Sequence, residues 1–348
     1  MVPVRKSGLN YIEFFWREKR NLNKTRCDVE RAFGSDVFLH SCEGPSPKDP
    51  ETSTESIHES DDEVVYTEIL HTKRGNLESI KKITRTESIA TVKGFVQDPQ
   101  QDRDKILELL KNPDSKDFTP YISDWRYVGD LGHCGFWLPT PVDWWSLLRR
   151  SPEVAIYDFV DYPHLIADFF KEYTNYAVAM TRRLLKNHRL MVDSIGLGGS
   201  TTSMSVISPK YLKEYIVGFV QAITAEARIY DIPVQYHMCG RSRHAIPILV
   251  EAGINGMDAL ERPSTGDVDL GEVKRLFGNR ISLRGNVNSI ETMLQGKPKD
   301  VENEVLRCMQ DAKRGGGFIL GVGDQTPYWT PDENIVALVE AGRRYGTY

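Results

Sequence analysis

The chain has 348 residues, of which 40% are hydrophobic and 27% are charged, and its formal net charge is -5. This size and composition predict a globular protein with one large core or two ordinary ones. The negative charge and the lack of a long basic stripe exclude nucleic acid and anionic membranes as expected partners. No apolar run approaches the roughly 20 residues of a membrane-spanning helix, and residues 1–6 lack the apolar core of a secretory signal, so we expect a cytoplasmic protein.

The first third of the chain predicts an accessory region. Residues 43–63 are polar, turn-rich and acidic, which predicts a solvated loop or a mobile insertion. Further along, residues 64–71 and 87–95 have the composition of strands, and residues 102–110 have that of a surface helix. We therefore expect residues 1–120 to form an N-terminal extension, with the acidic loop and a small β insertion, packed on a main domain of residues 121–348.

Large aromatic side chains gather in the segment that is predicted to form an early strand and its loop, and two more follow near the end of the chain. They are Trp125, Phe136, Trp137, Trp144, Trp145, Tyr328 and Trp329. Such side chains favour a substrate pocket, with Trp137, Tyr328 and Trp329 as substrate-binding residues. The competing interpretation is simple core packing, which suits the helix-like run around Trp144.

From about residue 190 the sequence alternates short β-type runs with longer helical patterns, which predicts parallel strands joined by crossover helices. The predicted strands are residues 190–195, 234–238, 256–260, 281–283 and 318–322. A long amphipathic segment, residues 162–185, precedes them. These β-α units favour an α/β fold, a (β/α)8 TIM barrel with an N-terminal extension and a small β insertion.

Polar side chains fall at or just beyond the C-terminal ends of the predicted strands. They are His237, Cys239, Glu261, Arg284, Asn286 and Asp324. Barrel enzymes assemble their sites at this end, so we expect Arg284 to bind substrate and Asn286 to take part in catalysis. The alternative for both residues is a structural role in hydrogen bonding at the end of the barrel. An open doubly wound sheet would use the same ends, but the chain has no G-x-G-x-x-G after a first strand and no P-loop sequence. Asp193, on a predicted buried strand, is either a catalytic acid or part of a structural network.

The segment His237-Met238-Cys239-Gly240 follows an apolar run, and Glu261 comes 22 residues after the cysteine. Imidazole nitrogen, thiolate sulfur and carboxylate oxygen are zinc ligands, and a catalytic zinc keeps one position open. The pattern predicts a zinc site. The alternative is a buried histidine beside an inert buried thiol. The five cysteines are too few and too scattered for a disulfide scaffold.

Read together, residues 190–345 resemble the uroporphyrinogen decarboxylase superfamily, and within it the corrinoid-linked, zinc-dependent methyltransferases. The resemblance lies in the ordered segments 237–240, 252–261, 269–278, 283–287, 316–320 and 330–334. It implies a (β/α)8 barrel with zinc as cofactor. It also implies a separate corrinoid protein as partner, because no corrinoid-binding (cobalamin-binding) domain is visible in the chain.

The resemblance also suggests the metal ligands and the direction of the chemistry. Relatives add a distant second cysteine to His-x-Cys, and the corresponding position here is Asp324, so the implied ligands are His237, Cys239 and Asp324. Glu261 is then a fourth ligand or a catalytic residue beside the metal. Thiolate donates more electron density than carboxylate, so a zinc with one sulfur ligand should be the stronger Lewis acid. This favours demethylation of a small methyl donor, best a methyl ether such as a methoxyaromatic, with the corrinoid cobalt as acceptor.

Two other functions stay open. A decarboxylase acting on a polycarboxylate would need several arginines at the barrel mouth and no metal, and the arginine-rich N-terminal segment of that branch has no counterpart in residues 1–23. A non-catalytic barrel that holds a corrinoid or another small ligand is the other possibility. The sequence leaves the oligomeric state open.

Overall fold

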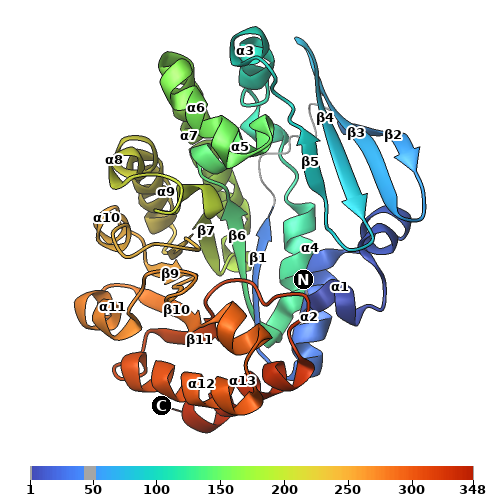
Figure 1. The fold of residues 1–348 in the computed structure, drawn as a ribbon. Helices are drawn as coiled ribbons and strands as arrows, with labels where there is room; N and C mark the ends of the chain where they lie inside the picture. Colours follow the sequence, from blue (N-terminus) through green and yellow to red (C-terminus); the bar gives the residue numbers. More distant parts are fainter. Residues whose placement is uncertain (1, 43–51, 348) are drawn as a thin grey trace.

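The computed structural model describes residues 2–42 and 52–347, and a barrel-like parallel sheet lies at its centre (Figure 1). Seven strands pair in the order β1-β6-β7-β8-β9-β10-β11. Their bounds are β1 (Val37–Cys42), β6 (Gly132–Leu138), β7 (Ser194–Gly198), β8 (Val234–His237), β9 (Gly256–Asp258), β10 (Ser282–Val287) and β11 (Phe318–Val322). Every pair is parallel, so all seven strands present their C-terminal ends at the same rim. The predicted fold class is confirmed.

Helices connect the strands and cover the outer face of the sheet (Figure 1). Those between β5 and the C-terminus are α3 (Pro99–Glu108), α4 (Thr119–Val128), α5 (Pro141–Arg149), α6 (Pro152–Asp161), α7 (Pro163–His188), α8 (Pro209–Tyr211), α9 (Val217–Ile229), α10 (Ile246–Glu251), α11 (Leu270–Phe277), α12 (Pro298–Ala312) and α13 (Asp332–Tyr345). Many begin with proline, whose missing N–H is no loss in a first helical turn. Helix α7 confirms the long amphipathic segment predicted at residues 162–185, and its apolar stripe is buried.

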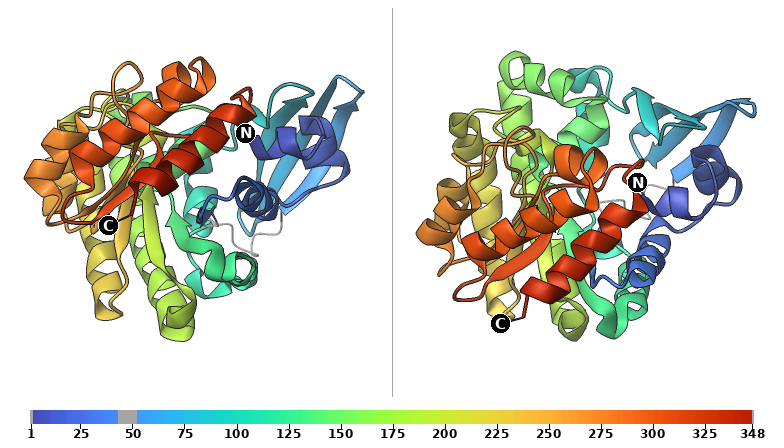
Figure 2. Two further views of the ribbon diagram at one scale, coloured as in Figure 1. Left: turned by 90° about the horizontal axis from the view of Figure 1, so that it is seen from below. Right: turned by 60° about the horizontal axis from the view of Figure 1, so that its bottom comes forward.

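Helices, rather than an eighth strand, bridge the two edges of the barrel. Within the described residues the sheet has seven strands, with β1 and β11 at its edges, where the sequence predicted eight. Helix α13 follows β11 and packs on α2 (Leu22–Phe33), which precedes β1. Arg343 of α13 donates a hydrogen bond of 2.7 Å to the carbonyl oxygen of Gly34, at the end of α2. Figure 2 shows α13, in red, with its first turn beside the N-terminal elements and its other end at the C-terminus.

An N-terminal lobe stands beside the barrel (Figures 1 and 2). It contains α1 (Val2–Lys6), a π-helical turn (Glu13–Arg17) and a four-stranded antiparallel sheet. The sheet order is β2-β3-β4-β5, with β2 (Thr52–Glu59), β3 (Glu63–Thr72), β4 (Gly75–Thr84) and β5 (Ala90–Lys93). The β insertion that the sequence predicted is therefore present, with four strands in place of the two that were predicted at residues 64–71 and 87–95.

The structure corrects two expectations in this region. Residues 43–51 of the predicted acidic loop lie outside the described residues, but residues 52–59 form the edge strand β2. Nearly all side chains of β2 are exposed, so the strand lacks the alternation by which a strand is recognised in a sequence. In addition, β1 belongs to the barrel although it lies inside residues 1–120, because the antiparallel sheet is inserted between β1 and β6.

One barrel strand starts later than predicted. The run at residues 190–195 was expected to be a strand, but Arg189–Met191 forms a 3-10 turn and β7 begins at Ser194. The apolar side chain of Leu190 suggested a buried strand, but it is 83% exposed. The true strand contains Gly196 and Gly198, whose low strand propensity concealed it.

The N-terminal lobe has its own apolar core, which reaches the end of the barrel. Its buried members are Val4, Tyr11, Ile12, Phe14, Val64, Tyr66 and Ile83. Tyr328, from the loop after β11, packs against this core with its ring centroid 5.7 Å from that of Tyr11. Arg5 and Lys6 of α1 also form ion pairs of 2.7 and 2.6 Å with Asp332 at the start of α13. The lobe is thus attached to the segment that follows the last barrel strand.

Two glycines leave room for an imidazole against the sheet. A Cβ at Gly135 would lie 2.7 Å from Cδ2 of His40, and a Cβ at Gly196 would lie 2.7 Å from the ring of Trp137 and 3.2 Å from His40. Burial lowers the pKa of His40 to about 3, so the ring is neutral at physiological pH. The strands here can approach the two rings only because both positions lack a side chain.

Gly196→Ala is therefore expected to lower the free energy of unfolding by about 1–3 kcal/mol through overpacking. Gly218→Ala is the matched control, since Gly218 lies in α9 and a Cβ there meets nothing within 4 Å. The control should leave stability unchanged or raise it by up to about 1 kcal/mol, because alanine favours helix. Urea unfolding of both variants measures the difference, and equal effects at the two positions would contradict the packing argument.

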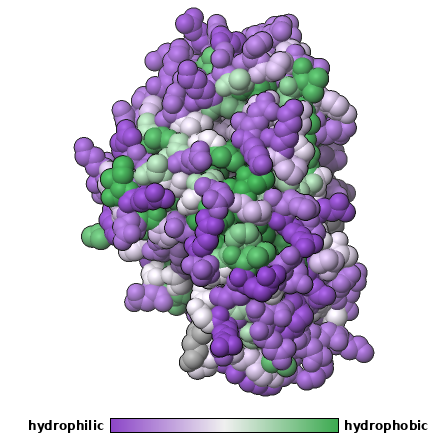
Figure 3. All heavy atoms as spheres, turned by 90° about the vertical axis from the view of Figure 1, so that its left-hand side faces the viewer, coloured by the Kyte–Doolittle hydropathy of each residue, from purple (hydrophilic) through white to green (hydrophobic). Residues whose placement is uncertain are grey.

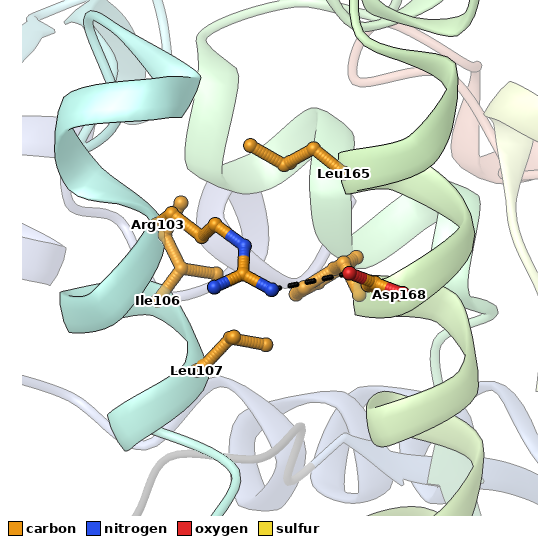
Figure 4. Close-up of a pocket in the computed structure, with 6 residues that line it drawn as sticks. Arg103, Ile106, Leu107, Leu165 and Asp168 are labelled. Carbon is orange, nitrogen blue, oxygen red and sulfur yellow. Dashed lines mark hydrogen bonds and ion pairs between the residues drawn. The ribbon is translucent and has the colours of Figure 1, made fainter.

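The outer surface of the described residues carries separate apolar groups and a shallow depression. Figure 3 shows the face that carries α8 and α10, where hydrophobic residues form separate groups among hydrophilic ones. A shallow depression lies between α3 and α7, lined by Ile106, Leu107 and Leu165, and the Arg103–Asp168 ion pair of 3.1 Å crosses it (Figure 4). Within residues 2–42 and 52–347, each helix is too short or too polar to cross a lipid bilayer.

Candidate metal centre

Three side chains with metal-binding atoms meet at the C-terminal rim of the barrel. His237 is the last residue of β8, Cys239 lies two residues beyond it, and Asp324 lies two residues beyond β11. One ligand atom from each lies within 4.8 Å of the other two. Within the described residues this is the one group of three or more His, Cys, Asp or Glu side chains placed closely enough to share a metal ion. The parallel strands bring together residues more than 80 positions apart.

A buried carboxylate holds His237 from the neighbouring strand. Asp258 ends β9 and is paired in register with His237, and its Oδ2 lies 3.1 Å from Nδ1 of the imidazole. The other ring nitrogen, Nε2, faces Asp324 Oδ1 at 3.8 Å. Burial alone would lower the pKa of His237, but hydrogen bonds with Asp258 and Cys239 outweigh it and raise the pKa to about 10. In the metal-free protein the imidazole is therefore protonated on both nitrogens, and a metal ion has to displace one of these protons.

Asp258 is held in turn by an arginine on the next strand. Arg284 of β10 forms an ion pair with Oδ1 of Asp258, and its guanidinium lies over the ring of Phe38 on β1 at 4.3 Å from the centroid. Burial would raise the pKa of Asp258, but Arg284 and His237 together hold it well below the usual range. Asp258 is 5% exposed, so this carboxylate is an ionised group inside the barrel.

A tight turn and a hydroxyl group set the position of Cys239. Gly240 has φ +76°, and a Cβ there would lie 2.9 Å from the hydroxyls of Ser203 and Ser205, so glycine suits this turn. The Gly240 amide donates a hydrogen bond to Glu261 Oε2. The Cys239 thiol donates to Ser200 Oγ at 3.3 Å. The sulfur therefore has one polar neighbour from the loop after β7.

Buried Asp143 anchors that loop. Its Oδ1 accepts the amide hydrogen of Thr201 at 3.1 Å, and a Cβ on Gly199 would lie 2.4 Å from the same oxygen. Asp143 belongs to the first turn of α5, where the Thr140 side chain caps the helix and donates to Oδ2 at 2.5 Å. Burial raises the pKa of Asp143 although these hydrogen bonds oppose the shift. The contacts fix the backbone on both sides of Ser200.

The side chain of Asp324 is 31% exposed, against 22% for that of His237. Burial raises its pKa, the charge of His237 opposes the rise, and the charge of Glu261 adds to it. Glu261 is thus close enough to act electrostatically on Asp324, but its carboxylate is bonded to the Gly240 amide and is not one of the three grouped ligands. The arrangement suits a supporting role for Glu261 beside the metal.

The predicted substrate-binding residues fall in three different surroundings. Trp137 is at the site, with its ring edge-on to His237 at 5.8 Å between centroids. Tyr328 packs on the N-terminal lobe, and Trp329, edge-on to Tyr328, is 72% exposed. Arg284 is committed to Asp258. Trp137 thus contacts one of the three grouped residues directly, and Arg284 is linked to His237 through Asp258.

Two predicted catalytic residues have structural contacts. Asn286 is fully buried, and its side chain donates to the Leu260 carbonyl at 2.7 Å and accepts from Arg307 at 2.8 Å. Asp193 immediately precedes the N-terminal end of β7, whereas His237 lies at the C-terminal end of the neighbouring strand β8. Its carboxylate accepts hydrogen bonds from Trp125 Nε1 and the Cys134 amide. These contacts correspond to the structural interpretation of both residues, and neither is used below.

Sequence reasoning missed Asp258 and Ser200. Asp258 is a polar residue at the end of a buried strand, which is the same signal that pointed to His237. The carboxylate predicted beside the metal was instead Glu261, three positions later. Ser200 follows Gly198-Gly199 at the end of β7 and offered only a short side chain in a flexible-looking loop. Strand register is what brings each beside a ligand, because Gly198 pairs with His237 and His237 with Asp258.

Known proteins of one family are similar to this chain. Residues 141–345 match the uroporphyrinogen decarboxylase (URO-D) family. The methylcobamide:CoM methyltransferase of Methanosarcina barkeri is 27% identical over 153 residues, which are 44% of this chain and 42% of that protein. The methylated-thiol coenzyme M methyltransferase of Methanosarcina mazei is 27% identical over 145 residues, which are 42% of this chain and 36% of that protein. The matches thus span less than half the length of these relatives.

A solved methyltransferase from Methanosarcina mazei has the same fold. It superposes with a TM-score of 0.66 and 16% sequence identity, over 99% of this chain and 90% of that one. The likeness includes the N-terminal lobe, because almost all of the present chain is covered. At this identity it speaks for the fold alone.

Proposed function

This chain belongs to the uroporphyrinogen decarboxylase (URO-D) family, and we propose that it is a zinc-dependent methyltransferase that exchanges a methyl group with the cobalt of a separate corrinoid protein. The observation that carries the proposal is the group of His237, Cys239 and Asp324 at the strand ends. The relatives named as methylcobamide and methylated-thiol methyltransferases support the same reaction class.

The donor atoms fit zinc. Imidazole nitrogen, thiolate sulfur and carboxylate oxygen are its usual ligands, and three protein ligands leave a position for substrate. Magnesium and calcium prefer oxygen donors alone, which a thiol and an imidazole do not supply. When bound, zinc would supply a Lewis acid that stabilises negative charge on the group that loses or receives the methyl. The chain's own residues would hold this position, with Trp137 as an apolar wall beside His237.

A methyl ether remains our sequence-based hypothesis for the methyl donor. In that reaction the C–O bond breaks with its electron pair left on oxygen, and cobalt(I) supplies the pair for the new C–Co bond. One sulfur among three donors favours an electron-poor metal that stabilises the departing alkoxide or phenoxide. The alternative donor or acceptor is a thiol, which the names of both relatives favour.

The decarboxylase alternative has less support. Binding several carboxylates requires free arginines, but Arg284 is paired with Asp258, and Arg262 just after β9 is paired with Glu304 at 2.8 Å. A purely binding role would not explain why a thiol, an imidazole and a carboxylate converge. Both alternatives can be separated from methyl transfer by experiment.

The zinc-loaded protein should be assayed in both directions with free corrinoids. Cob(I)alamin is offered a methoxyaromatic, a methylamine or a methylthiol, and methylcobalamin is offered coenzyme M, with the absorbance change reporting transfer. Transfer from the methoxyaromatic supports the ether hypothesis, and transfer confined to thiols contradicts it. No transfer with any substrate, together with release of carbon dioxide from uroporphyrinogen, would contradict the proposed function.

Replacing Asp324 separates metal binding from metal chemistry. Asp324→Ala is expected to weaken zinc binding by more than about 100-fold, because one of three direct donors is lost and an outer partner alone is worth about 10–100-fold. Asp324→Cys should retain zinc, since thiolate is an equally suitable ligand, but should slow any transfer from an ether because the metal becomes richer in electrons. Chelator competition and the methyl-transfer assay measure the two effects. Equal ether activity in Asp324→Cys and the unmodified protein would count against the Lewis-acid argument.

A further inference from the structure

We propose that Asp258 is a positioning residue that fixes the imidazole of His237 with Nδ1 hydrogen-bonded inside the barrel and Nε2 presented to the metal, and that Arg284 holds Asp258 in this role. The inference rests on the proposed function, because it assumes that His237 binds a metal ion. It assigns Asp258 and Arg284 to orientation of a ligand, instead of contact with substrate.

The contacts of Asp258 use both of its oxygens. Oδ2 accepts from Nδ1 of His237 at 3.1 Å, and Oδ1 accepts from the Ala259 amide at 2.7 Å and from Arg284. A carboxylate held at both oxygens cannot turn away from the imidazole. Since the two residues are also paired in strand register, backbone and side chain both fix the separation between them.

The orientation of His237 follows from this contact. With Nδ1 bonded to the carboxylate, the proton on a neutral imidazole lies on Nδ1, and the lone pair lies on Nε2. Nε2 is the nitrogen that faces Asp324, at 3.8 Å. A carboxylate behind a metal-binding histidine also raises the basicity of the ligand, which strengthens the metal–nitrogen bond.

Arg284 stabilises the buried carboxylate of Asp258. Asp258 is 5% exposed, and a buried carboxylate requires charged or hydrogen-bonded partners. Arg284 supplies the compensating charge, and its position over Phe38 of β1 holds it across the barrel interior. The order of contacts is therefore Phe38, Arg284, Asp258, His237 and then the metal.

The test is zinc affinity of Asp258→Asn, measured by competition with a chromogenic chelator on protein whose fold is checked by circular dichroism. The asparagine keeps the shape but removes the charge, so we expect affinity to fall by about 10–100-fold. Asp158→Asn is the matched control, because Asp158 is also buried and also bonds an arginine and a ring nitrogen, those of Arg149 and Trp145. The control should bind zinc like the unmodified protein.

A second measurement uses the unmodified protein, so a folding failure of the variant does not matter. Nitrogen-15 spectra of the histidine rings, assigned with His237→Gln, should show a proton on Nδ1 of His237 and the zinc-dependent shift on Nε2. Unchanged zinc affinity in Asp258→Asn, or zinc on Nδ1, overturns this inference alone. Failure of the unmodified protein to bind zinc overturns the inference and the proposed metal function together.

Discussion

Cys239→Ser is expected to remove bound zinc and to abolish methyl transfer. Cys239 supplies the single sulfur among the three grouped donors, and a serine hydroxyl ionises far less readily than a thiol. The loss of zinc affinity should exceed about 100-fold, because losing a direct ligand costs more than losing an outer partner. Metal analysis after dialysis against a weak chelator, followed by the methyl-transfer assay, gives the two values.

Cys308→Ser is the control for this substitution. Cys308 is fully buried on α12, and its sulfur accepts a hydrogen bond of 3.4 Å from Arg307. Serine there should cost some stability while zinc content and activity stay at the level of the unmodified protein. Full zinc content in Cys239→Ser would show that the metal is held elsewhere, and loss of zinc from both variants would point to unfolding.

Glu304→Ala is expected to lower the free energy of unfolding by about 3 kcal/mol. Glu304 of α12 is 6% exposed and accepts hydrogen bonds from Arg262, the Asn288 amide and the Thr292 hydroxyl. Its removal leaves buried donors without a partner. Breaking a buried ion pair in this way costs about 3–5 kcal/mol. Because Arg262 is partly exposed, we expect a loss of stability at the lower end of this range.

Glu302→Ala, on the same helix, is the control. Glu302 binds Arg344 and Lys299 at the surface, and such pairs contribute about 0–1 kcal/mol. Urea unfolding of the two variants should therefore give clearly different losses. Similar losses in both would mean that the buried network around Glu304 contributes no more than a surface ion pair.

The same network predicts a dependence on pH. Burial would raise the pKa of Glu304, but hydrogen bonds from Thr292 and Arg262 outweigh it, and the pKa in the folded protein is lowered. A lowered pKa contributes stability above the unfolded value of about 4.3, and that contribution is lost as the pH falls through the folded pKa. The advantage of the unmodified protein over Glu304→Gln should accordingly be largest above about pH 5 and shrink below it.

The barrel could be predicted because its strands are buried and follow one another. Residues 318–322 match β11, and residues 234–238 contain all of β8, since apolar runs between capped helices are strong signals. Strand β1 was not predicted as part of the barrel, because the antiparallel sheet separates it from β6 and a pairing at such distance leaves no local pattern. Strand β2 was missed because its exposed polar side chains resemble a loop.

The three residues of the candidate metal site could be predicted more readily than the groups around them. His237 and Cys239 have side chains of distinctive chemistry, Asp324 stands where the resembling family has a cysteine, and all three lie at strand ends that the parallel topology brings together. Asp258 and Arg284 depend on register and on the direction of side chains inside a barrel, which a single sequence does not contain. Aspartate is also a common surface residue, so the type of Asp258 carried no special signal, and Arg284 was expected to bind substrate instead of Asp258.

The contact between Tyr328 and the N-terminal lobe has a consequence for how firmly the metal would be held. Asp324 is separated from Tyr328 by three residues, and Tyr328 is seated in an apolar core that belongs to another part of the molecule. Two of the three donors, His237 and Cys239, lie at the end of barrel strand β8, whereas Asp324 lies in a loop that is attached to the N-terminal lobe through Tyr328. If the lobe unfolds before the barrel does, we expect Asp324 to lose its position before His237 and Cys239 lose theirs.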